Sequence, residues 1–124
     1  MTSWNARPKI EKEKLGNFDG ADFSKADLRK LTGKIDHLFH LAAIYDLQAS
    51  NEEQDTANIV GTDHALQFAE TVQAGCFHLT SSIAAAGLYK GSFRENMFEA
   101  ATGFDHPYFC TKHESEAMAR NRCK

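Results

Sequence analysis

The chain has 124 residues, enough for one domain at most. Hydrophobic residues make up 42% of it and charged residues 25%, a balance that excludes an intrinsically disordered chain. The net charge of −3 gives no reason to expect nucleic acid as a partner. No apolar run approaches the roughly 18 residues of a membrane span, so no membrane association is expected.

The cysteines and the N-terminus favour a reducing compartment. Cys76, Cys110 and Cys123 are odd in number and lack the spacing of metal or redox motifs. The first eight residues lack the apolar core of a secretory signal. We therefore expect a cytoplasmic protein.

The first third of the chain predicts an irregular start, a short helix and a strand. Residues 1–14 are polar and are expected to be irregular, and 24–32 predict a helix that Ser24 caps and Gly33 ends. Residues 35–43 are apolar after Asp36, which is typical of a strand buried on both faces of a parallel sheet. His37 and His40 are three apart on that strand and point to opposite faces, so we expect no shared metal.

A long helix over 51–74 is the best supported element. Ser50 and Glu53 form the pattern of a capping box, apolar residues recur at helical spacing, and Gly75 ends the helix. A second apolar strand at 76–80 follows and ends in a pair of serines. Strand, helix and strand make one βαβ unit, which predicts a parallel strand pair.

The last third combines loops with a final helix. Residues 83–106 lack periodicity and are expected to form loops beyond the strand ends, where open α/β sheets bind ligands. Helix 107–122 begins with Pro107 in its first turn. It places Tyr108 and Lys112 on one face, where an ammonium beside a phenol suits proton transfer. The same spacing also fits a surface helix with a half-buried tyrosine and a solvated lysine.

Four features resemble, in this order, an extended short-chain dehydrogenase/reductase, with epimerase/dehydratase-like and thioester or fatty-acyl reductase-like members as the most similar. They are His40-Leu41-Ala42-Ala43, Asn58-Ile59-Val60-Gly61-Thr62, Ser81-Ser82 and Tyr108-x-x-x-Lys112. The resemblance covers about residues 33–122. It implies an NAD- or NADP-dependent oxidoreductase that acts on a small carbonyl, alcohol or acyl-thioester substrate.

The resemblance also implies the catalytic residues. Tyr108 would be the general acid/base, and Lys112 would favour its phenolate form while binding the nicotinamide ribose. Ser82 would orient the substrate carbonyl, with Ser81 as the alternate.

Further residues would bind the cofactor. His40, Ala42 and Ala43 would line it at the end of the first strand, and Asn58 would order the site and its water. Taken alone, His40 could also be a partly buried histidine bonded to a backbone carbonyl. Asn58 alone could be a residue on the helix surface. No metal ligand is implied.

The implied fold is α/β, a partial Rossmann-like domain with a doubly wound parallel sheet. The sequence holds no G-x-x-G-x-x-G or G-x-G-x-x-G phosphate loop, on which dinucleotide binding normally depends. We therefore expect residues 1–124 to be one partial NAD(P)-binding domain without the glycine-rich βαβ unit and the C-terminal substrate lobe. Such an internal fragment is expected to be inactive alone.

Two other interpretations stay open. The chain could be a non-catalytic remnant or dimerisation module that binds a second copy or a full-length relative through helices 51–74 and 107–122. It could also fold only marginally, because two strands rarely form a stable sheet unless helices cover them.

Overall fold

The computed structural model describes residues 23–44, 46 and 48–123. The expected irregular start at 1–14 lies outside these residues. The elements in chain order are α1 (Lys25–Leu31), β1 (His37–His40), α2 (Asn51–Gln54), the π-helix η3 (Asp55–Val60), α3 (Gly61–Thr71), β2 (Cys76–Leu79), the 3₁₀-helices η4 (Ile83–Ala86) and η5 (Glu95–Ala100), and α4 (Pro107–Arg122).

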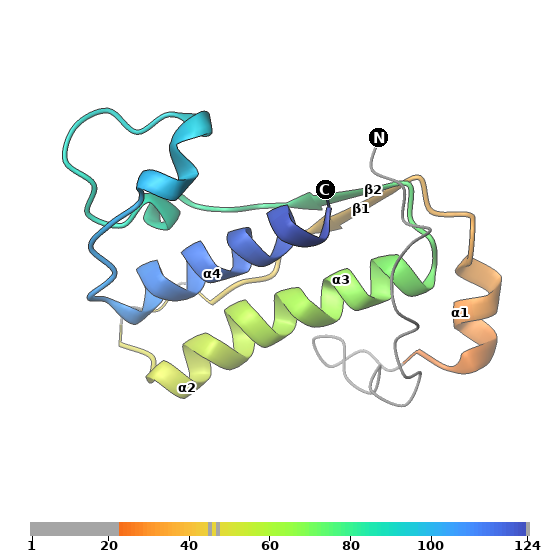
Figure 1. Ribbon diagram of the computed structural model, residues 1–124. Coiled ribbons are helices and arrows are strands. Elements are labelled where there is room, and N and C mark those ends of the chain that lie inside the picture. The colour runs from red at the N-terminus through yellow and green to blue at the C-terminus, as the bar shows by residue number, and fades with distance from the viewer. Residues whose placement is uncertain (1–22, 45, 47, 124) are drawn as a thin grey trace.

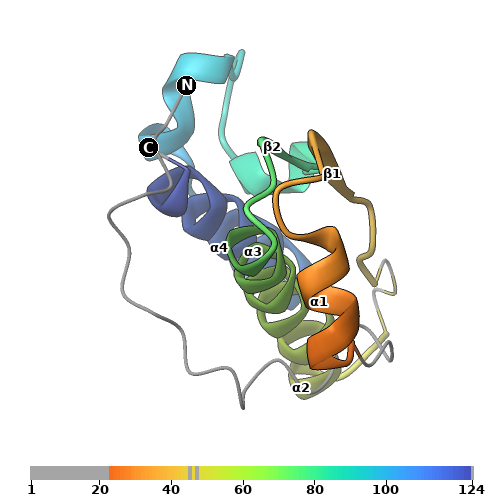
Figure 2. The ribbon, with the colours of Figure 1, turned by 90° about the vertical axis from the view of Figure 1, so that its right-hand side faces the viewer.

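A small α/β unit is built on one parallel strand pair. In β1 and β2 the register pairs His37 with Cys76 and His40 with Leu79. Helices α3 and α4 lie side by side on one face of the two strands, and α1 lies beside the C-terminal end of α3 (Figures 1 and 2). This confirms the predicted βαβ unit and its parallel pairing.

The helix boundaries follow the predicted caps. The Ser24 hydroxyl accepts a hydrogen bond from the Asp27 amide at the start of α1, and Gly33, beyond its end, has a φ of +73°. Ser50 and Glu53 form the expected capping box of α2. Helix α4 spans the predicted 107–122, with Pro107 in its first turn.

The long helix predicted over 51–74 is a composite. Segments α2, η3 and α3 follow one another without leaving helical backbone angles, but the middle six residues have π-helical bonding, in which the Gly61 amide donates to the Thr56 carbonyl. A π-helix inside an α-helix is rare and is often found at functional sites. The helix ends at Thr71, earlier than predicted, and Gln73 adopts a φ of +56°.

The core lies between α3 and the sheet. Buried residues of α3 and the turn after it form one cluster, against which α1 and both strands pack; its members are Phe68, Ala69, Val72 and Ala74. Phe23 packs on Phe68 with ring centroids 4.6 Å apart. Gly75 permits the tight turn into β2, because a Cβ there would lie 2.8 Å from the Asp36 carbonyl oxygen.

The prediction that the first strand is buried on both faces is wrong for the described structure. Phe39 is 62% exposed and Leu41 69% exposed, whereas His40 on the opposite face is buried. The strand is also shorter than the apolar run at 35–43. An apolar run cannot by itself tell a strand with two covered faces from one whose second face is left open.

The segment 83–106 is more ordered than predicted. It contains η4 and η5, and its ends are joined where Gly87 bridges Thr102 and the Leu88 amide donates to the Thr102 carbonyl at 2.7 Å. Gly87 has a φ of +65°, and a Cβ there would collide with the Thr102 carbonyl. Short 3₁₀ turns carry no sequence periodicity, which is why the sequence did not predict them.

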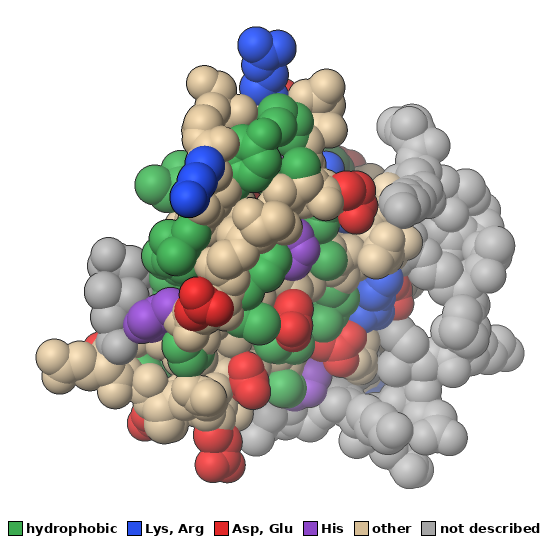
Figure 3. All heavy atoms as spheres, turned by 60° about the vertical axis from the view of Figure 1, so that its left-hand side comes forward, with side chains coloured by type: hydrophobic (Ala, Val, Ile, Leu, Met, Phe, Trp, Pro, Cys, Tyr) green, Lys and Arg blue, Asp and Glu red, His purple; other side chains and the backbone are tan. Residues whose placement is uncertain are grey.

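The described residues contain no helix long and apolar enough to cross a bilayer. On the face shown in Figure 3, acidic side chains gather over the lower half, and Lys and Arg side chains are fewer and lie apart. Five large hydrophobic side chains of the described residues are exposed: Phe39, Leu41, Val60, Ile83 and Leu88. Of these five, only Val60 lies on a helix predicted to form the interface. Association through those helices stays a prediction.

Candidate active site

Helix α4 presents Tyr108 and Lys112 to the interior. The His106 ring caps the helix, its Nδ1 accepting a bond from the Tyr108 amide at 3.1 Å. Tyr108 is 7% and Lys112 4% exposed. Positions four apart share a face of a helix, so both side chains point the same way. The interpretation as a surface helix with a solvated lysine is therefore wrong.

Lys112 reaches the end of β2. Its Nζ donates to the Thr80 carbonyl oxygen at 3.2 Å, directly before the two serines. Burial lowers the pKa of this lysine, and the nearby carboxylate of Glu116 opposes the shift. The ammonium thus lies where the strand ends, at the edge of the sheet at which parallel α/β folds bind ligands.

The two serines differ in their bonding. The Ser81 hydroxyl donates to the Glu116 carboxylate at 2.5 Å. The Ser82 oxygen accepts from the Ala84 amide at 3.1 Å and caps η4. Because Ser82 acts as an acceptor in that cap, its hydroxyl proton stays available for a further acceptor.

Glu116 and His113 complete the contact between α4 and this segment, and the sequence analysis missed both. Glu116 lies one turn beyond Lys112 and also pairs with Arg120, whose Nη2 is 2.7 Å from the carboxylate. His113 Nδ1 lies 2.9 Å from the Ala85 carbonyl oxygen and must therefore carry a proton. The i, i+4 spacing from Lys112 was the signal that could have found Glu116.

His40 is buried at the end of β1. Its Nε2 lies 3.2 Å from the Thr62 hydroxyl, which itself donates to the Asn58 carbonyl at 2.7 Å. Since the hydroxyl has one proton and gives it to that carbonyl, His40 Nε2 must be the donor to Thr62. The partner of His40 Nε2 is thus a side-chain hydroxyl.

Asn58 lies inside the π-helix and is almost fully buried. Its Oδ1 accepts from the Ile44 amide at 2.9 Å, and its Nδ2 donates to Thr111 at 3.1 Å and to Gln54 at 3.2 Å. One amide therefore joins the loop after β1, the helix that carries it and α4. The interpretation as a helix-surface residue is wrong.

Ala42 and Ala43 follow β1 and are exposed. The structure brings the end of β2 and α4 together through Lys112 and Ser81. It ties Asn58 to α4 through Thr111 and to His40 through Thr62. The sequence analysis did not select Thr62 or Thr111, because isolated threonines carry no motif.

Comparison with known proteins decides the family. The model of an NAD-binding family described as "Male sterility protein" matches residues 13–124. The chain belongs to this family. Membership in the male sterility protein family confirms the predicted resemblance to NAD(P)-dependent reductases. It implies a nicotinamide cofactor without distinguishing NAD from NADP.

Searches of curated proteins and of solved structures each found no significant match. Membership in the male sterility protein family suggests that the function is that of an NAD(P)-dependent oxidoreductase.

Proposed function

We propose that this chain carries the catalytic part of an NAD(P)-dependent reductase with a Rossmann-like sheet, and that Ser82, Tyr108 and Lys112 act on a carbonyl or acyl-thioester substrate. The observation that carries the proposal is the bond from the buried Lys112 ammonium to the Thr80 carbonyl. That bond holds the Tyr108 face of α4 against the strand end from which the serines project.

The proposed chemistry is proton transfer coupled to hydride transfer. The bound nicotinamide would supply the hydride. The Tyr108 hydroxyl would give its proton to the substrate oxygen, and Lys112 would stabilise the resulting phenolate by charge. Ser82 would donate its free hydroxyl proton to the same oxygen and orient the carbonyl.

The donor set suits one half of the cofactor. An ammonium and the neighbouring hydroxyls match the hydroxyl groups of a nicotinamide ribose, and His40, Ala42 and Ala43 would lie beside it at the end of β1. The pyrophosphate has no matching group, since the sequence lacks a glycine-rich loop. We therefore expect the 124-residue chain to bind NADH or NADPH weakly and to turn over no substrate alone.

The test joins the chain to the glycine-rich βαβ unit of another family member and measures reduction of aldehydes and acyl-CoA thioesters. Tyr108→Phe should lower turnover by about 10²–10⁴-fold, the usual share of general acid–base catalysis. Tyr89→Phe is the matched control, since Tyr89 packs edge-on against Phe93 in the loop segment. Equal turnover of Tyr108→Phe and Tyr89→Phe would show that Tyr108 is not the acid.

A further inference from the structure

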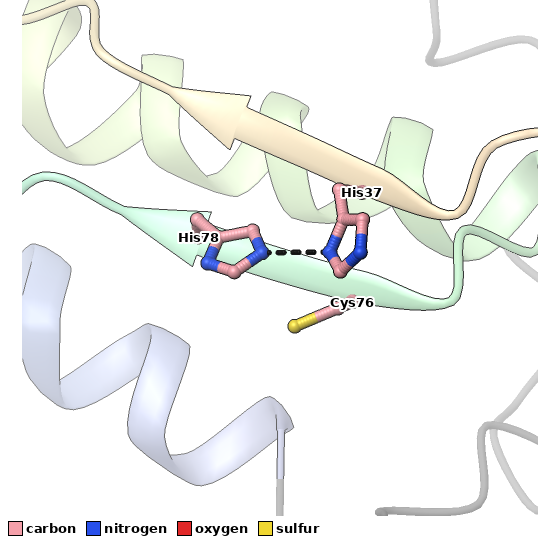
Figure 4. A group of neighbouring side chains, drawn as sticks. All are labelled: His37, Cys76 and His78. Atoms are coloured by element: carbon pink, nitrogen blue, oxygen red, sulfur yellow. Dashed lines mark hydrogen bonds between the residues drawn. The ribbon is translucent and has the colours of Figure 1, made fainter.

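Three side chains with metal-binding donor atoms share the exposed face of the sheet. They are His37 from β1 and Cys76 and His78 from β2, and Figure 4 shows all three leaving the strands on the same side. His37 and Cys76 are exposed, and His78 is half-buried.

The strand register explains why these residues meet. His37 is the direct partner of Cys76, and Phe39 is the partner of His78. Residues two apart on a strand share a face, so Cys76 and His78 point the same way as His37. The ring of Phe39 stacks on His78 at 4.3 Å with an interplanar angle of 9°, which holds that imidazole in place.

The donor atoms are close to the spacing that a tetrahedral ion requires. Bond lengths of about 2.0–2.1 Å to nitrogen and about 2.3 Å to sulfur place tetrahedral donors roughly 3.3–3.6 Å apart. His37 Nδ1 and His78 Nε2 lie 3.0 Å apart, and no pair of the three donors exceeds 4.8 Å. The rings need to part by a few tenths of an ångström, and rotation of the exposed Cys76 side chain can bring its sulfur closer.

We propose that His37, Cys76 and His78 form a binding site for Zn²⁺ or a divalent ion of similar ligand preference. Two imidazoles and one thiolate are ligands that Zn²⁺ favours, and three protein ligands leave a fourth position for water or another donor. The sequence analysis expected no metal, because His37 lies on one strand, Cys76 and His78 lie on the other, and only the strand register brings the three together.

The site is separate from the candidate active site. His37 and Cys76 begin their strands, whereas Lys112 binds at the carboxyl end of β2. The His37 face is also opposite the face that carries His40 and packs on the helices. The ion would therefore link the two strands and take no part in the proposed reduction of the substrate.

Without metal, the two imidazoles share one hydrogen bond, in which one ring nitrogen donates and the other accepts. An ion needs lone pairs on both nitrogens and a thiolate on Cys76. Binding therefore moves the shared proton to the other nitrogen of its own ring and releases the thiol proton, so it should weaken as pH falls. An ion that binds the folded chain alone also stabilises it against unfolding.

The experiment titrates the 124-residue protein with Co²⁺ under a reductant that does not bind metals, and then displaces the ion with Zn²⁺. We expect one Co²⁺ per chain, the visible absorption of a tetrahedral ion and a thiolate-to-cobalt band in the near ultraviolet. Cys76→Ser should abolish the thiolate band. His78→Gln should weaken binding by at least about tenfold, because loss of a ligand costs no less than loss of a supporting contact.

Two controls have the same chemistry away from the site. Cys110→Ser keeps a donor for Glu114, and His64→Gln changes a histidine on α3. Both should bind Co²⁺ like the parent protein. A thiolate band that survives Cys76→Ser, or vanishes in Cys110→Ser, overturns the site, as does absence of binding to the folded parent.

A second measurement needs no variant and remains informative if a substitution disturbs folding. Zn²⁺ should slow alkylation of Cys76, read by mass spectrometry, and leave the rate at Cys110 unchanged. Equal protection of both thiols, or protection of neither, would contradict the assignment.

Discussion

Replacement of Asn58 by alanine tests whether its buried amide holds the candidate site together. The side chain makes three hydrogen bonds of 2.9–3.2 Å, to Ile44, Thr111 and Gln54, and a longer one of 3.4 Å to the Ile44 carbonyl. The three shorter bonds dominate the energy. At about 1 kcal/mol each, their loss costs about 3 kcal/mol. The Ile44 amide, left without its acceptor, adds about 1 kcal/mol. Alanine returns roughly 0.6 kcal/mol through its higher helix propensity.

The expected loss in the free energy of unfolding is therefore about 3 kcal/mol, a large share of the roughly 5–15 kcal/mol typical of a domain. Urea denaturation followed by circular dichroism measures it. Asn96→Ala is the matched control, because Asn96 is exposed and its change should stay within about 0.5 kcal/mol. A loss below about 1 kcal/mol for Asn58→Ala would show that the three bonds do not act as described.

Two further predictions rest on the titration of the buried Lys112 and the half-buried Cys110. Burial lowers the pKa of Lys112 below its ordinary value of 10.5, so between the two values the unfolded chain binds a proton that the folded chain does not. Stability should therefore rise with pH through that window. The urea midpoint should rise less with pH in Lys112→Met than in the control Lys90→Met. An equal rise in both variants would refute the prediction. Burial, together with a hydrogen bond to Glu114, raises the pKa of the Cys110 thiol, so iodoacetamide should label Cys110 more slowly than the exposed Cys76. Glu114→Gln should speed the labelling of Cys110, and an unchanged rate would exclude the carboxylate as a cause.

Local signals predicted the α-helices and both strands, but not the 3₁₀-helices or the π-helix. The capping box at Ser50, the helical spacing after it and Pro107 act within one or two turns, so a single sequence carries them. The alternation of strand and helix then fixed the parallel pairing. The ends of the strands were less predictable, because the apolar run at 35–43 continues beyond the four residues that pair in β1.

The polar network was not predictable in the same way. Thr62, Thr111 and Glu116 matter through partners on other elements, at His40, Asn58 and Ser81. Nothing in a threonine's own neighbourhood along the chain indicates such a contact. The pairing of His37 with Cys76 likewise depends on the register of two strands, which the sequence alone leaves open.

The π-helix lets one residue connect both ends of the network. The Asn58 carbonyl accepts from Thr62, which accepts from His40 at the end of β1. The Asn58 side chain donates to Thr111, whose hydroxyl donates to the Tyr108 carbonyl at 3.2 Å.

A continuous series of hydrogen bonds thus runs from the end of β1 to the first turn of α4. Its members His40, Asn58, Thr62 and Thr111 are all buried, so an unmatched donor or acceptor anywhere along it has no water to replace the lost partner. Residues that the sequence presented as separate motifs are therefore constrained together. A shift of β1 by one residue would break the bond at His40 and leave Thr62 without its donor. This is a physical reason for a buried histidine at the end of β1, whether or not it also contacts a cofactor.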